Sequence, residues 1–150
     1  MTGWTWVAWG VSFALGPPAS AQRVDEGDLG VTVVAARQSF LGAAGGVAWR
    51  SGQARVAVSA ALGSEAGAAA FRLSGTAAFV LSPAARDRTP YAGLGLSFAG
   101  VRRGAGAGYL VAVLGLEAAP AERRGWYVEA GLGGGVWAAA GIRWRYVLPG

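Results

Sequence analysis

The sequence predicts an all-β chain folded as an eight-stranded antiparallel up-and-down barrel. After Gln22, apolar and polar side chains alternate with a period of two, and no stretch shows a 3.6-residue apolar stripe with helix caps. Clusters of Gly, Ser and Pro separate the alternating stretches where hairpins need turns. The stretches are also long, at about 9 to 13 residues, which is unusual for a soluble β-sandwich.

The first 21 residues form a separate segment. The 13 arginines and 8 acidic residues of the chain all lie after Gln22. An apolar run from Trp4 to Leu15 precedes a helix-breaking Gly-Pro-Pro and an Ala-x-Ala ending at Ala21, which is the layout of a cleavable secretory signal. We expect residues 1–21 to be a signal peptide cleaved after Ala21, and residues 22–150 to form one barrel domain. An uncleaved anchor is the alternative, although a spanning helix needs ~20 apolar residues.

Four alternating stretches predict the first half of the barrel. In the third stretch, Val56, Val58 and Leu62 lie on one face and Arg55 and Ser59 on the other. The fourth repeats the pattern, with large apolar residues opposite polar ones, and the first two alternate more weakly. A Ser-Gly pair and a Gly-rich run mark the turns on either side of the third stretch. The expected strands are 29–37, 40–50, 54–62 and 69–81.

Four more stretches predict the second half. In the fifth, Leu94, Leu96 and Phe98 lie opposite Gly95 and Ser97. The last stretch sets large apolar and aromatic residues against two arginines. Turn-forming runs rich in Gly, Pro or Ser again separate the stretches. The expected strands are 91–99, 109–117, 126–132 and 136–148.

The composition of the two strand faces predicts which face lies inside. The face opposite the Leu, Val and Phe residues is mostly Gly, Ala and Ser with scattered Arg and Glu, and only 14% of the chain is charged. A soluble barrel would expose this face and should carry more charge on it. Small residues and a few paired charges suit the narrow lumen of an eight-stranded barrel, and the large apolar face then contacts lipid. At ~3.3 Å per residue and a ~40° tilt, the strands cross an apolar band of ~25 Å, so the expected fold is a transmembrane β-barrel.

Outward aromatic residues support this assignment. An even number of strands places both chain termini on the periplasmic side, and two groups of aromatics then separate by level. Phe71 and Phe98 lie toward the outer level. Aromatic girdles at both interfaces are typical of membrane barrels. The expected periplasmic interface aromatics are Trp49, Phe79, Trp126, Trp144 and Tyr146.

Charged side chains on the inward face predict a lumen charge network. A buried ion without a partner costs several kcal/mol, so these side chains are expected to pair across the lumen. We interpret the network as a polar plug that stabilises the barrel, because eight strands enclose no open channel. The expected members of the network are Arg72, Glu117, Glu129, Arg143 and Arg145.

In their alternating strands and in the composition of the two strand faces, residues 28–148 resemble the small eight-stranded outer-membrane barrels of the OmpA and OmpX type. The ending that contains Gly141, Trp144 and Tyr146 resembles the Gly-x-x-aromatic-x-aromatic assembly signal of such barrels. The resemblance implies a location in the outer membrane of a Gram-negative-type bacterium. It also implies two partners, outer-membrane lipid and the outer-membrane assembly machinery.

The residues that the chain lacks limit its chemistry. With no Cys and no His, thiolate and imidazole metal sites and histidine-dependent hydrolases are excluded. We expect no metal, no cofactor and no catalytic residue. We also expect no nucleic-acid partner, because the net charge of +5 is carried by arginine without lysine in a chain rich in Ala and Gly, which is typical of a GC-rich coding bias. The expected function is a non-enzymatic structural or envelope role. The alternatives are a soluble periplasmic lipocalin-like barrel for a small apolar ligand and a lipid-modifying barrel enzyme that works without histidine.

Overall fold

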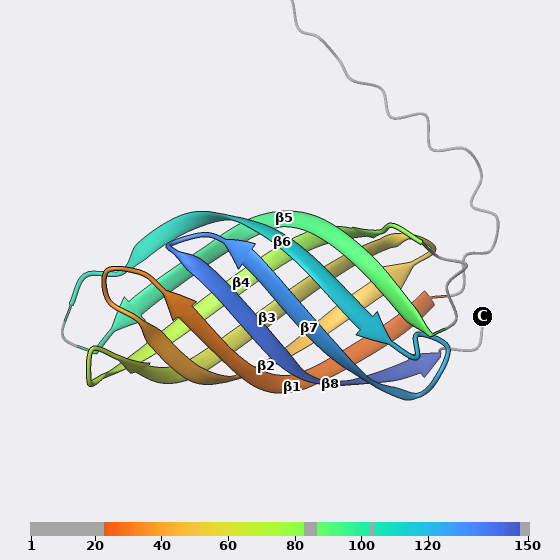
Figure 1. The fold of residues 1–150 in the computed structure, drawn as a ribbon, viewed down its shortest axis with the longest axis horizontal. Coiled ribbons are helices and arrows are strands. Elements are labelled where there is room, and N and C mark those ends of the chain that lie inside the picture. The colour runs from red at the N-terminus through yellow and green to blue at the C-terminus, as the bar shows by residue number, and fades with distance from the viewer. Residues whose placement is uncertain (1–22, 83–86, 103, 148–150) are drawn as a thin grey trace, which may run out of the picture.

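The computed structural model describes residues 23–82, 87–102 and 104–147, which form eight antiparallel strands closed into a barrel (Figure 1). Each strand pairs with the next along the sequence, and β1 pairs with β8 to close the ring. This confirms the predicted fold class. Within the same ranges, no helix has the length and hydrophobicity needed to span a membrane. The strands are β1 (Arg23–Ala35), β2 (Phe40–Ser51), β3 (Ala54–Glu65), β4 (Ala68–Val80), β5 (Arg88–Val101), β6 (Ala107–Ala118), β7 (Arg124–Leu132) and β8 (Val136–Val147).

The start of β1 differs most from the expected boundaries. It begins at Arg23 rather than at residue 29, because backbone pairing continues through a polar segment that has no apolar alternation. Val24 pairs with Arg50 of β2 on one side and with Val147 of β8 on the other. Neighbours on both sides satisfy the backbone N–H and C=O groups whatever the side chains are. The extension brings Glu26 and Asp28 into the barrel wall.

The connections between strands lie at the two ends of the barrel. They cover residues 36–39, 66–67, 102–106 and 133–135 at the end opposite the termini, and 52–53, 81–87 and 119–123 at the end that carries the termini. The two-residue turn between β3 and β4 uses positive φ at both Ala66 (48°) and Gly67 (82°). Two positive φ angles match the right-handed twist of a two-residue hairpin. The expected signal peptide lies outside the described residues.

The outward face of the barrel is apolar, and its most exposed large side chains are leucines. Leu110 is 81% exposed, Leu62 is 71% exposed and Leu94 is 70% exposed. Phe71 and Phe98 lie on the same face with ring centroids 6.0 Å apart. The arginines and acids of the strand centres point the other way, into the barrel. The predicted assignment of faces is therefore confirmed for the described strands.

Glycine makes room for large aromatic side chains inside the narrow barrel. Tyr91 of β5 lies directly opposite Gly115 of β6, and a side chain at Gly115 would overlap the Tyr91 ring. Trp137 of β8 lies opposite Gly131 of β7 in the same way, where an added Cβ would lie 2.7 Å from the indole nitrogen. The small inward residues Gly115 and Gly131 are thus the positions over which the two lumen aromatics pack.

Replacing Gly115 with Val should destabilise the barrel by about 1–3 kcal/mol. The added side chain would push the buried Tyr91 ring out of its place beside the lumen ion pairs. Urea unfolding of the protein refolded in detergent would measure the loss. Gly75→Val is the matched control, because an added Cβ at Gly75 meets no atom within 4 Å, and an equal effect of both substitutions would contradict the packing argument.

Candidate functional site

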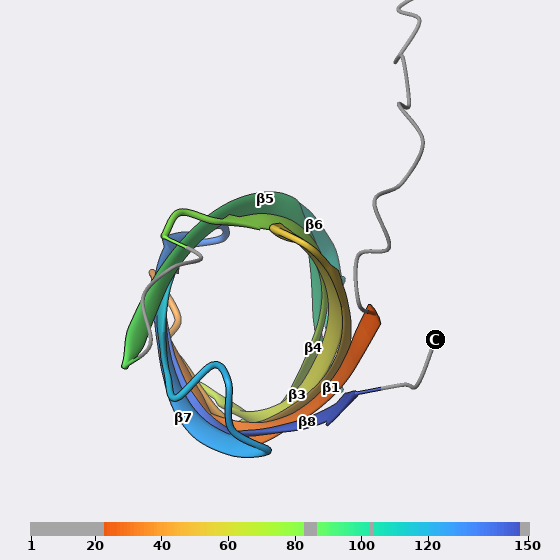
Figure 2. The ribbon, with the colours of Figure 1, turned by 90° about the vertical axis from the view of Figure 1, so that its right-hand side faces the viewer.

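Among the described residues, polar and charged side chains gather in the lumen of the barrel. Figure 2 shows the ring of strands from the end that carries the termini. Moving inward from that end, the lumen holds a cluster of ion pairs, then a small polar cavity, and then a closure formed by apolar residues and Arg72. A recess open to solvent follows at the far end.

Glu117 is the centre of the ion-pair cluster. Its Oε1 accepts a hydrogen bond of 2.7 Å from Arg50 Nη1, and its Oε2 accepts bonds of 2.9 Å from Arg143 Nη1 and 3.0 Å from Arg145 Nη2. The Glu117 side chain is 1% exposed. Three arginines from two strands therefore share one buried carboxylate of β6.

Glu26 is a second acidic centre on the opposite wall. Arg55 Nε donates to its Oε2 at 2.7 Å. Arg143 and Arg145 approach the same carboxylate with Nε–O distances of 3.8 and 3.6 Å. Because these two arginines reach both Glu26 and Glu117, they join β1, β6 and β8 through one network.

Aromatic rings hold the guanidinium of Arg143 from both sides. Its Cζ lies 4.6 Å from the Tyr127 ring centroid and 5.6 Å from that of Tyr91. The Tyr91 hydroxyl donates to Glu129, and Arg143 Nη2 lies 3.4 Å from the same carboxylate oxygen. Cation–π contacts of this kind gain strength away from water, and Arg143 is fully buried at 0% exposure.

The cluster is electrically balanced. Four arginines (Arg50, Arg55, Arg143 and Arg145) face four carboxylates (Glu26, Asp28, Glu117 and Glu129) at ion-pair distances between 2.7 and 3.9 Å. A balanced, hydrogen-bonded group is the condition under which buried charges are tolerated. The cluster therefore acts as a neutral plug that crosses the lumen near the termini.

Arg145 also fixes the connection that closes this end. Its Nη1 donates to the carbonyl oxygens of Ala119 at 3.0 Å and Glu122 at 3.3 Å. In Figure 2 the β6–β7 connection bends inward over the opening of the ring. One side chain thus links the ion-pair cluster to the turn above it.

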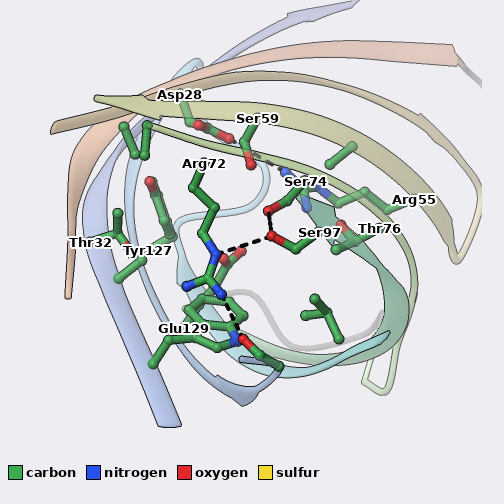
Figure 3. Close-up of a pocket in the computed structure, with 17 residues that line it drawn as sticks. Asp28, Thr32, Arg55, Ser59, Arg72, Ser74, Thr76, Ser97, Tyr127 and Glu129 are labelled. Atoms are coloured by element: carbon green, nitrogen blue, oxygen red, sulfur yellow. Dashed lines mark hydrogen bonds and ion pairs between the residues drawn. The ribbon is translucent and has the colours of Figure 1, made fainter. Parts of the chain in front are cut away.

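A cavity of about 80 Å³ follows the cluster. Figure 3 shows hydroxyl groups around it, among them Ser59, Ser74, Thr76 and Ser97. Since a water in the liquid takes ~30 Å³ and ligand pockets measure ~300 Å³ or more, the cavity has space for a few waters but not for a lipid or a drug-sized ligand.

Arg72 closes the cavity on the other side and lies away from the ion-pair cluster. Its Nε donates to Ser97 Oγ at 3.1 Å, its Nη2 donates to the Gly133 carbonyl at 2.7 Å, and its Cζ lies 5.8 Å from the Tyr109 ring centroid. Figure 3 shows the hydrogen bond from Arg72 to Ser97 as a dashed line. Val34, Phe40, Ala61 and Ala70 form a buried apolar group at the same end.

The structure brings together four of the five residues expected in the network, namely Glu117, Glu129, Arg143 and Arg145. Including Arg72 was wrong, because its position on β4 places it closer to the far end, where it contacts a hydroxyl and a carbonyl. Sequence reasoning missed Glu26 and Asp28, since β1 was expected to begin after them. Arg50 and Arg55 lie on the inward face by parity, and this signal could have found them. The missed members are Glu26, Asp28, Arg50, Arg55, Tyr91 and Tyr127.

The expected interface aromatics lie on the outward face near the termini. Phe79, Trp49 and Trp126 are 63%, 40% and 43% exposed, and Tyr146 is 64% exposed. Trp144 shares their side of the sheet, because its neighbours Arg143 and Arg145 point inward. Trp126 is also covered by Arg88, whose Cζ lies 6.0 Å from the ring centroid. The five side chains thus face outward from the same end of the barrel.

Gly141, the first residue of the expected assembly signal, has a packing role of its own. It lies opposite Gly30 across the β1–β8 seam, and a Cβ there would meet the Gly30 Cα at 2.7 Å. The close approach of the two strands where the barrel closes therefore requires glycine at this position.

The surroundings of Ser97 do not suit nucleophilic chemistry. Ser97 Oγ contacts Arg72 Nε and Ser74 Oγ, and neither group is a base that could activate the hydroxyl. Across residues 23–82, 87–102 and 104–147, no group of three or more acidic, His or Cys side chains is placed to hold a metal ion.

Comparisons with known proteins identify the fold through structure and not through sequence. No protein-family model matches the chain, and no curated protein is significantly similar to it in sequence.

The chain is similar in structure to three crystal structures of bacterial proteins. The outer membrane protein OprG of Pseudomonas aeruginosa matches with a TM-score of 0.65 and 10% identity, over 85% of this chain and 98% of that one. The N-terminal β-barrel domain of Pseudomonas aeruginosa OprF matches with a TM-score of 0.59 and 15% identity, over 84% and 98%. Neisserial surface protein A matches with a TM-score of 0.53 and 15% identity, over 83% and 97%. The chain has the fold of the small eight-stranded outer-membrane β-barrels.

Proposed function

We propose that the chain is an integral protein of a Gram-negative-type outer membrane, with a non-enzymatic role in the structure of the envelope. The observation that carries the proposal is the inverted arrangement of polarity. Large apolar side chains cover the outward face, and the lumen holds the eight charges of the ion-pair cluster together with Arg72. In water this arrangement would expose most of the apolar surface, whereas in a bilayer it places each face in its preferred medium.

Lipid is the proposed partner of the outward face. Phe71 and Phe79 lie eight residues apart on β4, which corresponds to ~20 Å along the barrel axis at ~3.3 Å per residue and a ~40° tilt. This distance is close to the ~25 Å apolar band of outer-membrane barrels. Trp49, Trp126 and Trp144 face outward at the same end as Phe79, where their amphipathic rings suit the headgroup level.

The outer-membrane assembly machinery is the second proposed partner. The last strand carries Gly141, Trp144 and Tyr146 in the order that the assembly signal of such barrels has, and Tyr146 is 64% exposed. A signal peptide over residues 1–21, cleaved after Ala21, would direct the chain to the periplasm, where this strand could be recognised. Nucleic acid is not among the proposed partners, because five of the thirteen arginines lie inside the lumen.

Two alternatives are weaker. A lipocalin-like barrel needs an apolar interior for its ligand, but the lumen here holds ion pairs, a cavity of about 80 Å³ and a recess whose lining includes the charged side chains Arg37, Glu65 and Arg72. A lipid-modifying enzyme needs an activated nucleophile that the substrate can reach, but the Ser97 hydroxyl lies inside the barrel between Arg72 and Ser74. The closed lumen therefore favours a structural role over catalysis or transport of a large solute.

Labelling of single cysteine variants tests membrane insertion. The chain contains no native Cys, so each variant reports one position. Cysteine at Leu94, Leu96, Leu114 or Val128, in protein embedded in bilayers, should react with a lipid-soluble probe and be shielded from a water-soluble one. Protection from both probes, or free reaction with the water-soluble probe, would contradict the proposal.

Two further positions calibrate the labelling. Glu122→Cys, in the exposed β6–β7 connection, should react with the water-soluble probe. Ser59→Cys, beside the cavity, should react slowly with either probe because the plug and Arg72 close the lumen on both sides. Heat-modifiable migration on a detergent gel should show that every variant is folded.

A further inference from the structure

Arg72 differs from the other arginines of the lumen in having no acidic partner. Arg50, Arg55, Arg143 and Arg145 each lie within ion-pair distance of at least one carboxylate. Among the described residues, the contacts of Arg72 are instead a hydroxyl, a backbone carbonyl and an aromatic ring. The positive charge of Arg72 is therefore oriented by neutral groups, and no carboxylate of the described residues lies within ion-pair distance of it; Glu65, which lines the same recess, acts on it only at longer range.

The Arg72 side chain lies at the boundary of two spaces. One is the polar cavity of about 80 Å³, and the other is a recess of about 640 Å³ at the mouth opposite the termini. A guanidinium has five N–H donors, and the contacts to Ser97 and Gly133 use two of them. Donors thus remain for a group that enters the recess.

The recess carries an excess of positive charge. Arg37, Gln38 and Tyr109 line it together with Arg72 and supply further donors, and Glu65 is its single carboxylate. Two guanidinium groups facing one carboxylate leave a net charge of +1 in a space wide enough for a small oxyanion. The recess lies inside the ring, since Val34, Phe40 and Ala99 of the inward face also line it.

We propose that Arg72, with Arg37 and the donors around it, forms a binding site for a small soluble oxyanion, a carboxylate or an inorganic phosphate, in the outer mouth of the barrel. Guanidinium groups bind such anions through charge-assisted and often paired N–H···O bonds. The bonds from Arg72 to Ser97 and Gly133 hold the guanidinium in place before the anion arrives, which lowers the cost of ordering on binding. The site is separate from the ion-pair cluster and does not depend on the proposed structural role.

Titration of the refolded full-length protein in neutral detergent micelles with inorganic phosphate, and separately with acetate, tests the site. Two-dimensional NMR would follow the Arg72 Nε–H signal and the amides of Gly133 and Gly134. We expect saturable shifts with a dissociation constant of roughly millimolar, the range for one exposed charged site. Arg72→Gln should remove the saturable shifts of the two glycine amides, and Arg37→Gln should weaken binding by about tenfold.

Two variants distinguish this site from general attraction to a basic protein. Glu65→Gln should tighten binding severalfold, because it removes the carboxylate that competes for the two arginines. Arg88→Gln removes the same charge as Arg37→Gln from the opposite end of the barrel and should leave binding unchanged. Equal weakening by Arg88→Gln and Arg37→Gln, or shifts that never saturate, would overturn the proposal.

Folding and the source of the anion are controlled separately. If Arg72→Gln fails to fold, Arg72→Lys takes its place in the titration. This variant keeps the charge but not the paired geometry, and it should bind the anion more weakly than the unaltered chain does. Full retention of binding in a folded Arg72 variant would overturn the assignment. A lysophospholipid anchored in the micelle should not reproduce the shifts, since the recess opens within the ring and not toward lipid. Shifts caused by the lysophospholipid alone would assign the site to a headgroup and overturn the soluble-anion proposal.

Discussion

Replacing Glu117 with Gln should destabilise the barrel by about 3–5 kcal/mol. The substitution removes the negative charge that accepts hydrogen bonds from Arg50, Arg143 and Arg145, all within 3.0 Å. The four arginines of the cluster then face three carboxylates, Glu26, Asp28 and Glu129, so that one buried positive charge is left without a partner. Urea unfolding in detergent or in bilayers, followed by heat-modifiable gel migration, measures the loss.

Two comparisons test whether the effect comes from charge balance. Glu122→Gln, in the exposed connection near the same end, should change stability by less than about 0.5 kcal/mol. The double variant Glu117→Gln with Arg50→Gln should recover part of the loss, because it removes one uncompensated cation together with the anion. A loss below about 1 kcal/mol for Glu117→Gln alone would mean that the cluster is hydrated and is not a plug.

Replacing Leu114 with Arg should cost about 2–4 kcal/mol of stability in a bilayer and impair insertion. Leu114 is 66% exposed on the outward face of β6, so the new charge would lie in hydrocarbon near the middle of the strand. A protein that folds in water with the same surface would tolerate this substitution, since exposed positions rarely change stability by more than ~0.5 kcal/mol. Unfolding of the refolded barrel in lipid vesicles measures the difference.

An arginine substitution at a second depth in the membrane tests whether the effect at Leu114 comes from the bilayer. Leu116, two residues closer to the termini on the same face, lies opposite Val128 and nearer to the level of Trp126. Leu116→Arg should cost less than Leu114→Arg, because the penalty for a charge falls to ~0–1 kcal/mol near the interface. Equal costs at the two positions would argue against a bilayer around this face.

The period-two alternation was sufficient to predict the barrel and its orientation. A strand exposes alternate side chains to opposite surroundings, so parity along each segment assigns every residue to one face. The exposed Leu62 and the buried Arg55 of β3 show that the assignment holds residue by residue. The same rule placed Glu117, Glu129, Arg143 and Arg145 inside before any contact was known.

The start of β1 could not be predicted in the same way. Residues 23–28 carry four charges in six residues, a composition that is typical of a loop. Their strand conformation comes from neighbours on both sides, β2 and β8, which are distant in sequence. Tertiary context overrides local propensity where backbone pairing and buried ion partners compensate polar side chains.

The sequence by itself determined the class of fold, the number of strands and the face that each side chain occupies, since these follow from a local period and from turn-forming residues. Only the tertiary structure decided which charges meet. The tilt and stagger of the strands set the level of each inward side chain. This geometry brought Glu26 of β1 to the arginines of β8 and left Arg72 of β4 without a carboxylate at ion-pair distance. The plug and the exposed position of Arg72 on the recess are therefore properties of the closed barrel, because a pairing energy depends on distances of a few ångströms between residues that lie up to 119 positions apart in the chain.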